Sequence, residues 1–153
     1  MSPGDYSVIV ANPSPGGGSS ANFVFSVWSL TQQQVSGVVI PYPPSWTATS
    51  SSPAAGEGIY ISPSQEEGDN SGISVSILPP GTNVIDSSYV LIRQTTMQIG
   101  ARNWTVVVQQ EPDSGQLFYD ASITTSGGVF DVGGPDTPQN EAVVNNIISS
   151  VNP

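Results

Sequence analysis

The C-terminal third of the chain alternates strand-like segments with turns and ends in one amphipathic segment. Strands are predicted at residues 96–99, 104–108, 117–123 and 129–132, separated by turns that contain Gly, Asn, Asp or Pro. Strands joined by connections this short pair with their neighbours in sequence and form an antiparallel meander. A single sheet of this kind buries its apolar face only when another element packs against it.

The last segment, residues 138–151, predicts the helix that covers this sheet. Thr137 is suited to cap the helix, Pro138 to occupy its first position, and Glu141 to lie near the positive end of its dipole. Apolar residues then recur on one helical face: Val143, Val144, Ile147, Ile148 and Val151. The predicted fold class is α+β, an antiparallel β-sheet meander packed against a C-terminal α-helix.

The preceding part of the chain is less regular. A Ser-, Thr- and Pro-rich stretch at residues 47–56 predicts a loop, and Asp86 is placed to cap a short helix over residues 87–94. Earlier strands are predicted from Phe23 onward and at residues 37–40, 58–62 and 73–77.

The chain is expected to hold a single α+β domain over residues 23–153, preceded by a flexible arm or linker at residues 1–22. Residues 12–20 are rich in Gly, Pro and Ser, which are typical of a linker. Tyr6, Val8 and Val10 alternate in a strand-like run. The run belongs either to a disordered tether or to an arm that pairs with a neighbouring subunit.

Composition excludes several classes of function. The chain has no Lys, His or Cys, its only cations are Arg93 and Arg102, and its net charge is −10. Two arginines do not neutralise a run of phosphates, so we expect no nucleic-acid binding. No apolar run approaches the roughly 18 residues of a membrane-spanning helix. Because a serine nucleophile needs a base that His or Lys would supply, we expect a non-enzymatic protein.

Acidic residues offer weak sites for metal or hydrolytic chemistry. Glu66, Glu67, Asp69 and Asn70 lie within five residues and form a weak Ca²⁺ candidate, although a solvated acidic turn is the favoured explanation. No other cofactor is expected.

Three further carboxylates are candidates for glycoside hydrolysis, with Glu111 paired to Asp113 or to Asp120. Glu111 and Asp113 lie in a predicted turn, where an apolar pocket that would raise one pKa is hard to form. Asp131 and Asp136 form a second, weaker Ca²⁺ pair, unless Asp136 helps to cap the final helix.

Several aromatic residues are open to two interpretations. Trp28, Tyr42, Trp46, Tyr60, Tyr89 and Trp104 either line a sugar-stacking surface or, for Trp46 and Trp104 above all, belong to the core. Arg102 is a candidate anchor for an acidic partner surface. The predicted interaction residues are therefore Tyr6, Val8, Val10, Tyr42, Trp46, Arg102 and Trp104.

The order of elements resembles the fold family of the photosystem PsbP protein and its bacterial lipoprotein relatives. The matching motifs are residues 40–46 (IPYPPSW), residues 98–104 (QIGARNW) with the strands through Asp120, residues 128–132, and residues 147–151 (IISSV). The resemblance covers roughly residues 35–152. It implies a PsbP-like fold and an envelope-exposed binding or accessory module, and it carries over no catalytic residue.

The resulting expectation is a surface- or envelope-exposed accessory domain that acts through protein–protein contacts. One alternative is a structural subunit of a virion or extracellular filament that uses the N-terminal segment as an intersubunit arm. A second alternative is a carbohydrate-binding domain. Only 9% of residues are charged, and this Ser-, Thr-, Gly- and Pro-rich composition favours an extracellular, cell-envelope or virion-surface location.

Overall fold

The computed structural model describes residues 4–8, 23–27, 31–51, 57–63 and 71–151 and confirms an α+β fold. These residues form eleven strands and one helix: β1 (Gly4–Val8), β2 (Phe23–Val27), β3 (Thr31–Val35), β4 (Val38–Tyr42), β5 (Thr47–Ser51), β6 (Glu57–Ser62), β7 (Ile73–Leu78), β8 (Val90–Ile99), β9 (Arg102–Gln110), β10 (Leu117–Thr125), β11 (Gly128–Pro135) and α1 (Pro138–Ser150).

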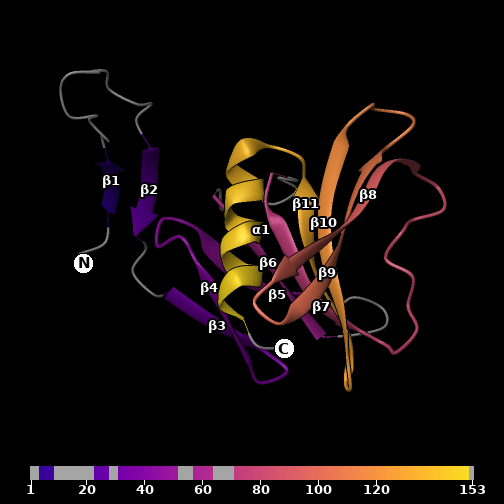
Figure 1. Ribbon diagram of the computed structural model, residues 1–153, viewed down its shortest axis with the longest axis horizontal. Helices are drawn as coiled ribbons and strands as arrows, with labels where there is room; N and C mark the ends of the chain where they lie inside the picture. The colour runs from indigo at the N-terminus through magenta and orange to yellow at the C-terminus, as the bar shows by residue number, and fades with distance from the viewer. Residues whose placement is uncertain (1–3, 9–22, 28–30, 52–56, 64–70, 152–153) are drawn as a thin grey trace, which may run out of the picture.

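Seven strands form one antiparallel sheet in the order β5-β6-β7-β11-β10-β9-β8. The predicted C-terminal meander is confirmed as β8-β9-β10-β11, and a second meander, β5-β6-β7, joins it where β7 pairs with β11. Residues 79–89 connect β7 to β8, so this segment travels from the middle of the sheet to its far edge (Figure 1).

Helix α1 covers one face of this sheet (Figure 1) and begins as predicted. Thr137 is the N-cap, and its side chain accepts a hydrogen bond from the backbone N–H of Asn140 at 3.1 Å. The Asn140 side chain is buried and donates to the carbonyl oxygens of Ser71 and Pro135, both at 2.9 Å. The amide therefore ties the start of the helix to the end of β11 and to the segment before β7.

The core lies between α1 and the sheet. Trp104 and Phe130 pack edge to face with their ring centroids 6.0 Å apart, a favourable arrangement for an aromatic pair. A small sheet of β3 and β4 closes the core, to which it contributes Val35, Ile40 and Tyr42. All five apolar residues predicted on the helical stripe are buried: Val143, Val144, Ile147, Ile148 and Val151.

Two predictions of local structure were wrong. Residues 90–94, predicted as part of a helix over residues 87–94, instead begin strand β8 and continue into the predicted strand at 96–99, because β8 pairs with β9 along almost its whole length. Asp86 accepts bonds from the backbone N–H and hydroxyl of Ser88, at 2.8 and 2.7 Å, so it stabilises a turn. Residues 47–51, predicted as a loop, form β5 through backbone pairing with β6.

Strands β1 and β2 form a two-stranded sheet of their own. Tyr6 pairs with Phe25 and Val8 with Phe23, whereas Val10 lies outside the described residues. The predicted boundary between residues 22 and 23 therefore falls between two strands that pair with each other.

Candidate functional site

The seven-stranded sheet presents a second face, away from α1, which we call the strap face. On β9 and β10 the side chains alternate, so that Val106 and Ala121 enter the core while Val107 and Asp120 point to the strap face. The segment 79–89 crosses this face. Its Asp86 N–H donates to Gln109 Oε1 at 2.9 Å.

Asp120 and Asp131 lie on the strap face in adjacent strands. Asp120 of β10 pairs with Gly133, and Asp131 of β11 pairs with Ser122, which makes the two carboxylates diagonal neighbours. A Cβ added to Gly133 would lie 1.9 Å from Asp120 Oδ1. The absence of a side chain at Gly133 therefore makes room for the Asp120 carboxyl group.

Burial dominates the electrostatics of both carboxylates. It raises the pKa of Asp120 to about 6, against a hydrogen bond with Gln109 that lowers it. Burial, together with the charge of Asp120, raises the pKa of Asp131 to about 7. Asp131 Oδ1 is sealed from solvent and has no hydrogen-bond partner in the described part of the chain.

A cavity of about 370 Å³ opens beside Asp120, and we call it the strap-face pocket. Tyr89 and Phe118 meet at one side with ring centroids 5.4 Å apart and planes inclined by 44°. Tyr60 lines the same cavity, and its hydroxyl accepts a bond from the Gly72 N–H at 2.8 Å. The remaining lining includes Glu111, Gln116, Gly133 and Gly134. Burial, followed by the charges of the nearby acids, raises the pKa of Tyr89.

Both arginines of the chain lie on the opposite face. Arg93 pairs with Val108, and Arg102 is two residues from Trp104; both of these neighbours are core residues on the side of α1. Arg93 acts electrostatically on Glu141, whose pKa is raised mainly by its hydrogen bond with Asp136 and is lowered by Arg93. The carboxylates of the strap face are thus not neutralised by either arginine.

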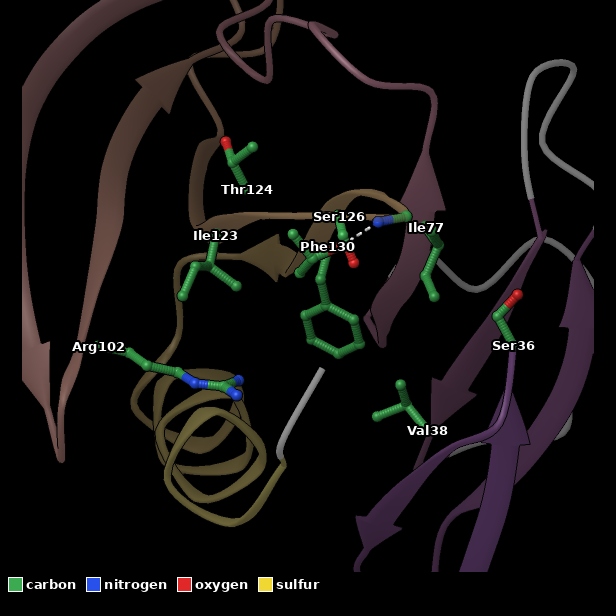
Figure 2. A pocket seen from close by; sticks show the side chains of 10 residues that line it. Ser36, Val38, Ile77, Arg102, Ile123, Thr124, Ser126 and Phe130 are labelled. Atoms are coloured by element: carbon green, nitrogen blue, oxygen red, sulfur yellow. Dashed lines mark hydrogen bonds between the residues drawn. The ribbon is translucent and has the colours of Figure 1, made fainter.

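Arg102 lines a second cavity, of about 520 Å³, on the side of α1. Figure 2 shows Arg102 on one side, Ser36 and Val38 on the other, and Phe130 between them. Thr124 and Ser126 add hydroxyl groups to the apolar lining. The idea that Arg102 anchors an acidic partner stays a prediction.

Trp28 lies outside the described residues, and three of the other aromatic candidates do not form a stacking surface. Trp104 and Trp46 are only 1% and 5% exposed, and Tyr42 is also buried, so all three belong to the core. Tyr60 and Tyr89, from the same set, do line a cavity, and Phe118 joins them. Sequence reasoning missed Phe118, although its place two residues before Asp120 puts both side chains on one face of a strand.

The acidic residues proposed as Ca²⁺ ligands do not form a metal site within the described residues. Glu66, Glu67, Asp69 and Asn70 lie outside the described residues. The described segments contain no group of three His, Cys, Asp or Glu residues that is arranged to hold a metal ion. Asp131 and Asp136 are not brought together, since Asp136 bonds with Glu141 near the start of α1 while Asp131 lies on the strap face.

Glu111 and Asp120 line the strap-face pocket together, whereas Asp113 is exposed. The pKa of Asp120 is raised because the pocket buries it, which its neighbours in sequence do not indicate. The burial of Asp120 depends on a tertiary contact, because residues 79–89 cross the sheet and cover this face.

The chain matches no family model, and a search of curated proteins finds no relative. The resemblance to the PsbP family therefore stays a prediction. Among the described residues, no helix is long and apolar enough to cross a membrane.

Proposed function

We propose that this protein is a non-enzymatic binding or accessory domain, exposed in the cell envelope or outside the cell, that acts through protein–protein contacts at strand β8. The observation that carries the proposal is the exposure of this strand. It forms one edge of the seven-stranded sheet, and Val90, Leu91 and Ile92 are 51%, 44% and 53% exposed.

An edge strand of this kind is suited to accept another strand. Its outer edge presents unpaired backbone N–H and C=O groups, which natural proteins usually protect with charges, prolines or short strands. β8 has ten residues, no proline and one charged residue, Arg93. A register shift between Leu91 and Arg93 locally interrupts pairing with β9, and the apolar run lies at that point.

The charge distribution indicates what the partner strand carries. Residues 87–110 contain both arginines and no acidic residue, while all twelve acidic residues of the chain lie elsewhere. Arg93 is exposed on β8. An extended partner segment with apolar side chains to cover Val90–Ile92 and a carboxylate to meet Arg93 therefore fits this edge best.

Site-specific photo-crosslinking in cells of the source organism tests this proposal. A photoreactive phenylalanine analogue at Leu91 should yield a discrete adduct heavier than the protein by the mass of a partner. The same analogue at Ala142, which is exposed on α1, is the matched control. An adduct from the control position alone, or from neither position, contradicts the proposal.

The assembly alternative is distinguished by the mass of the adduct. An adduct of twice the mass of the chain would identify a second copy at β8 and favour the virion or filament subunit. Fractionation of the same cells tests the proposed location, which rests on composition.

The strap-face pocket does not favour the carbohydrate alternative. Three aromatic rings line it, but they surround carboxylates that no internal cation neutralises. This combination favours a charged ligand over a neutral sugar.

A further inference from the structure

We propose that the strap-face pocket binds an organic cation, an alkylammonium or guanidinium group, held between Asp120, Glu111 and the rings of Tyr60, Tyr89 and Phe118. This inference is independent of the proposed role of β8, which lies at the edge of the sheet.

Charge is the first reason. Asp120 and Glu111 both line the cavity, and Asp131 lies diagonally behind Asp120 on the same face. Both arginines point to the opposite face, so a positive ligand would supply the missing counter-charge. Because Asp120 is largely buried, its attraction for such a ligand is screened less than that of a surface carboxylate.

The unpartnered oxygen of Asp131 is a second and independent observation. A buried carboxylate oxygen without a hydrogen bond is costly, and natural proteins retain few such groups. Asp131 lies outside the pocket lining but close enough to Asp120 for the charge of Asp120 to raise its pKa. Asp120 thus lines the pocket, and Asp131 is a second poorly compensated carboxylate beside it on the same face of the sheet.

The aromatic lining indicates the kind of cation. Ammonium and guanidinium groups are attracted to the faces of Tyr and Phe rings, and the attraction grows when the site excludes water. A bare metal ion would instead need several oxygen ligands close together, and the described residues offer no such cluster. Tyr60, Tyr89 and Phe118 therefore favour an organic cation.

Closely packed glycine backbone forms part of the pocket lining. Gly72, Gly133 and Gly134 line it without side chains, and a Cβ on any of them would lie less than 3 Å from a neighbouring atom. Closely packed glycines form a floor on which the head of a lysine or arginine side chain, or of a free polyamine, can rest.

The experiment is a titration of the ¹⁵N-labelled full chain, monitored by amide chemical shifts at pH 7.5. The probes are Nα-acetyl-lysine methylamide, Nα-acetyl-arginine methylamide and spermidine, with Nα-acetyl-norleucine methylamide as the neutral control. Glycine amides are convenient reporters because Gly72, Gly133 and Gly134 line the pocket, while Gly37 and Gly100 lie away from it. The cationic probes should shift the first three selectively, and the neutral probe should not.

Two variants test whether the cation binds at this pocket. Asp120→Asn keeps the shape of the side chain and should weaken binding at least about tenfold, as expected for losing a charged partner. Asp113→Asn removes an equal charge from an exposed position and should change affinity less than about twofold. Thermal unfolding of both variants confirms that the fold is retained.

The relative affinities identify the source of the cation. Tighter binding of the lysine or arginine probe points to a side chain of a partner protein, and tighter binding of spermidine to a free polyamine. Equal shifts with the norleucine probe, no shifts with any probe, or an Asp120→Asn variant that binds as well as the natural chain would overturn the proposal.

Discussion

Asp120 and Asp131 lie diagonally across β10 and β11 on one face of the sheet, and neither is neutralised by an arginine. Their pKa values are raised to about 6 and about 7 by burial, and in Asp131 also by the charge of Asp120. In the unfolded chain both groups ionise near pH 4. The native state therefore binds more protons than the unfolded state between about pH 4 and pH 7.

The first prediction concerns the pH dependence of stability. Because the native state holds the extra protons, the free energy of unfolding should fall as pH rises from 5 to 8, by on the order of 3 kcal/mol. Glu57 and Asp86 have lowered pKa values, so they lose their contribution below pH 4.5, outside this range. Urea unfolding at pH 5, 6.5 and 8 measures the change, and a stability that rises over this range would contradict it.

The second prediction isolates Asp131. Asp131→Asn removes a buried charge whose Oδ1 has no partner, so it should raise the free energy of unfolding at pH 8 by about 2 kcal/mol and have little effect at pH 5. Asp113→Asn is the control, since Asp113 is exposed. The same urea series provides the measurement, and a loss of stability at pH 8 would show that the carboxylate has a stabilising partner.

Gly133 provides a third prediction, based on space alone. In Gly133→Ala the new Cβ would lie 1.9 Å from Asp120 Oδ1 and 2.7 Å from the carbonyl oxygen of Tyr119. We expect a loss of about 2 to 4 kcal/mol in the free energy of unfolding. Because the contact with the backbone remains, combining it with Asp120→Ala should restore only part of the loss. Gly127→Ala is the control, with its nearest atom at 3.8 Å, and equal effects of the two alanines would refute this explanation.

The sequence predicted the elements whose signal is local. The helix was evident because its five apolar residues recur on one face and because Thr137 and Pro138 mark its start. The meander followed in the same way from short turns. Neither inference required knowledge of distant contacts.

The candidate site was less predictable because it depends on contacts between distant segments. Asp86 indicated a helix cap from its neighbours alone, yet pairing with β9 made the next residues a strand. Nothing near Asp120 in the sequence indicates burial, and it is buried because residues 79–89 cross the strap face. A single sequence contains no direct sign of this crossing.

The fourth prediction concerns the exposed end of β8. Leu91→Lys and Ile92→Lys, combined in one variant, should change the free energy of unfolding by less than about 1 kcal/mol, because both side chains are about half exposed. The same variant should lose cross-linking from a photoreactive group placed at Val90, since two charges disfavour burial against a partner strand. If this variant keeps its stability and still cross-links as strongly as the natural chain, β8 is not part of the interface.

The fifth prediction tests how the start of α1 is held. Asn140→Ala leaves the carbonyl oxygens of Ser71 and Pro135 without their side-chain donor, and these bonds connect the helix to segments distant in sequence. Because the amide is buried, its loss should lower the free energy of unfolding by about 2 to 3 kcal/mol. Gln139→Ala, at the exposed neighbouring position, should have almost no effect in the same urea titration. If the two variants are equally stable, water replaces the amide at both carbonyls, and the start of the helix is fixed by Thr137 and the apolar stripe alone.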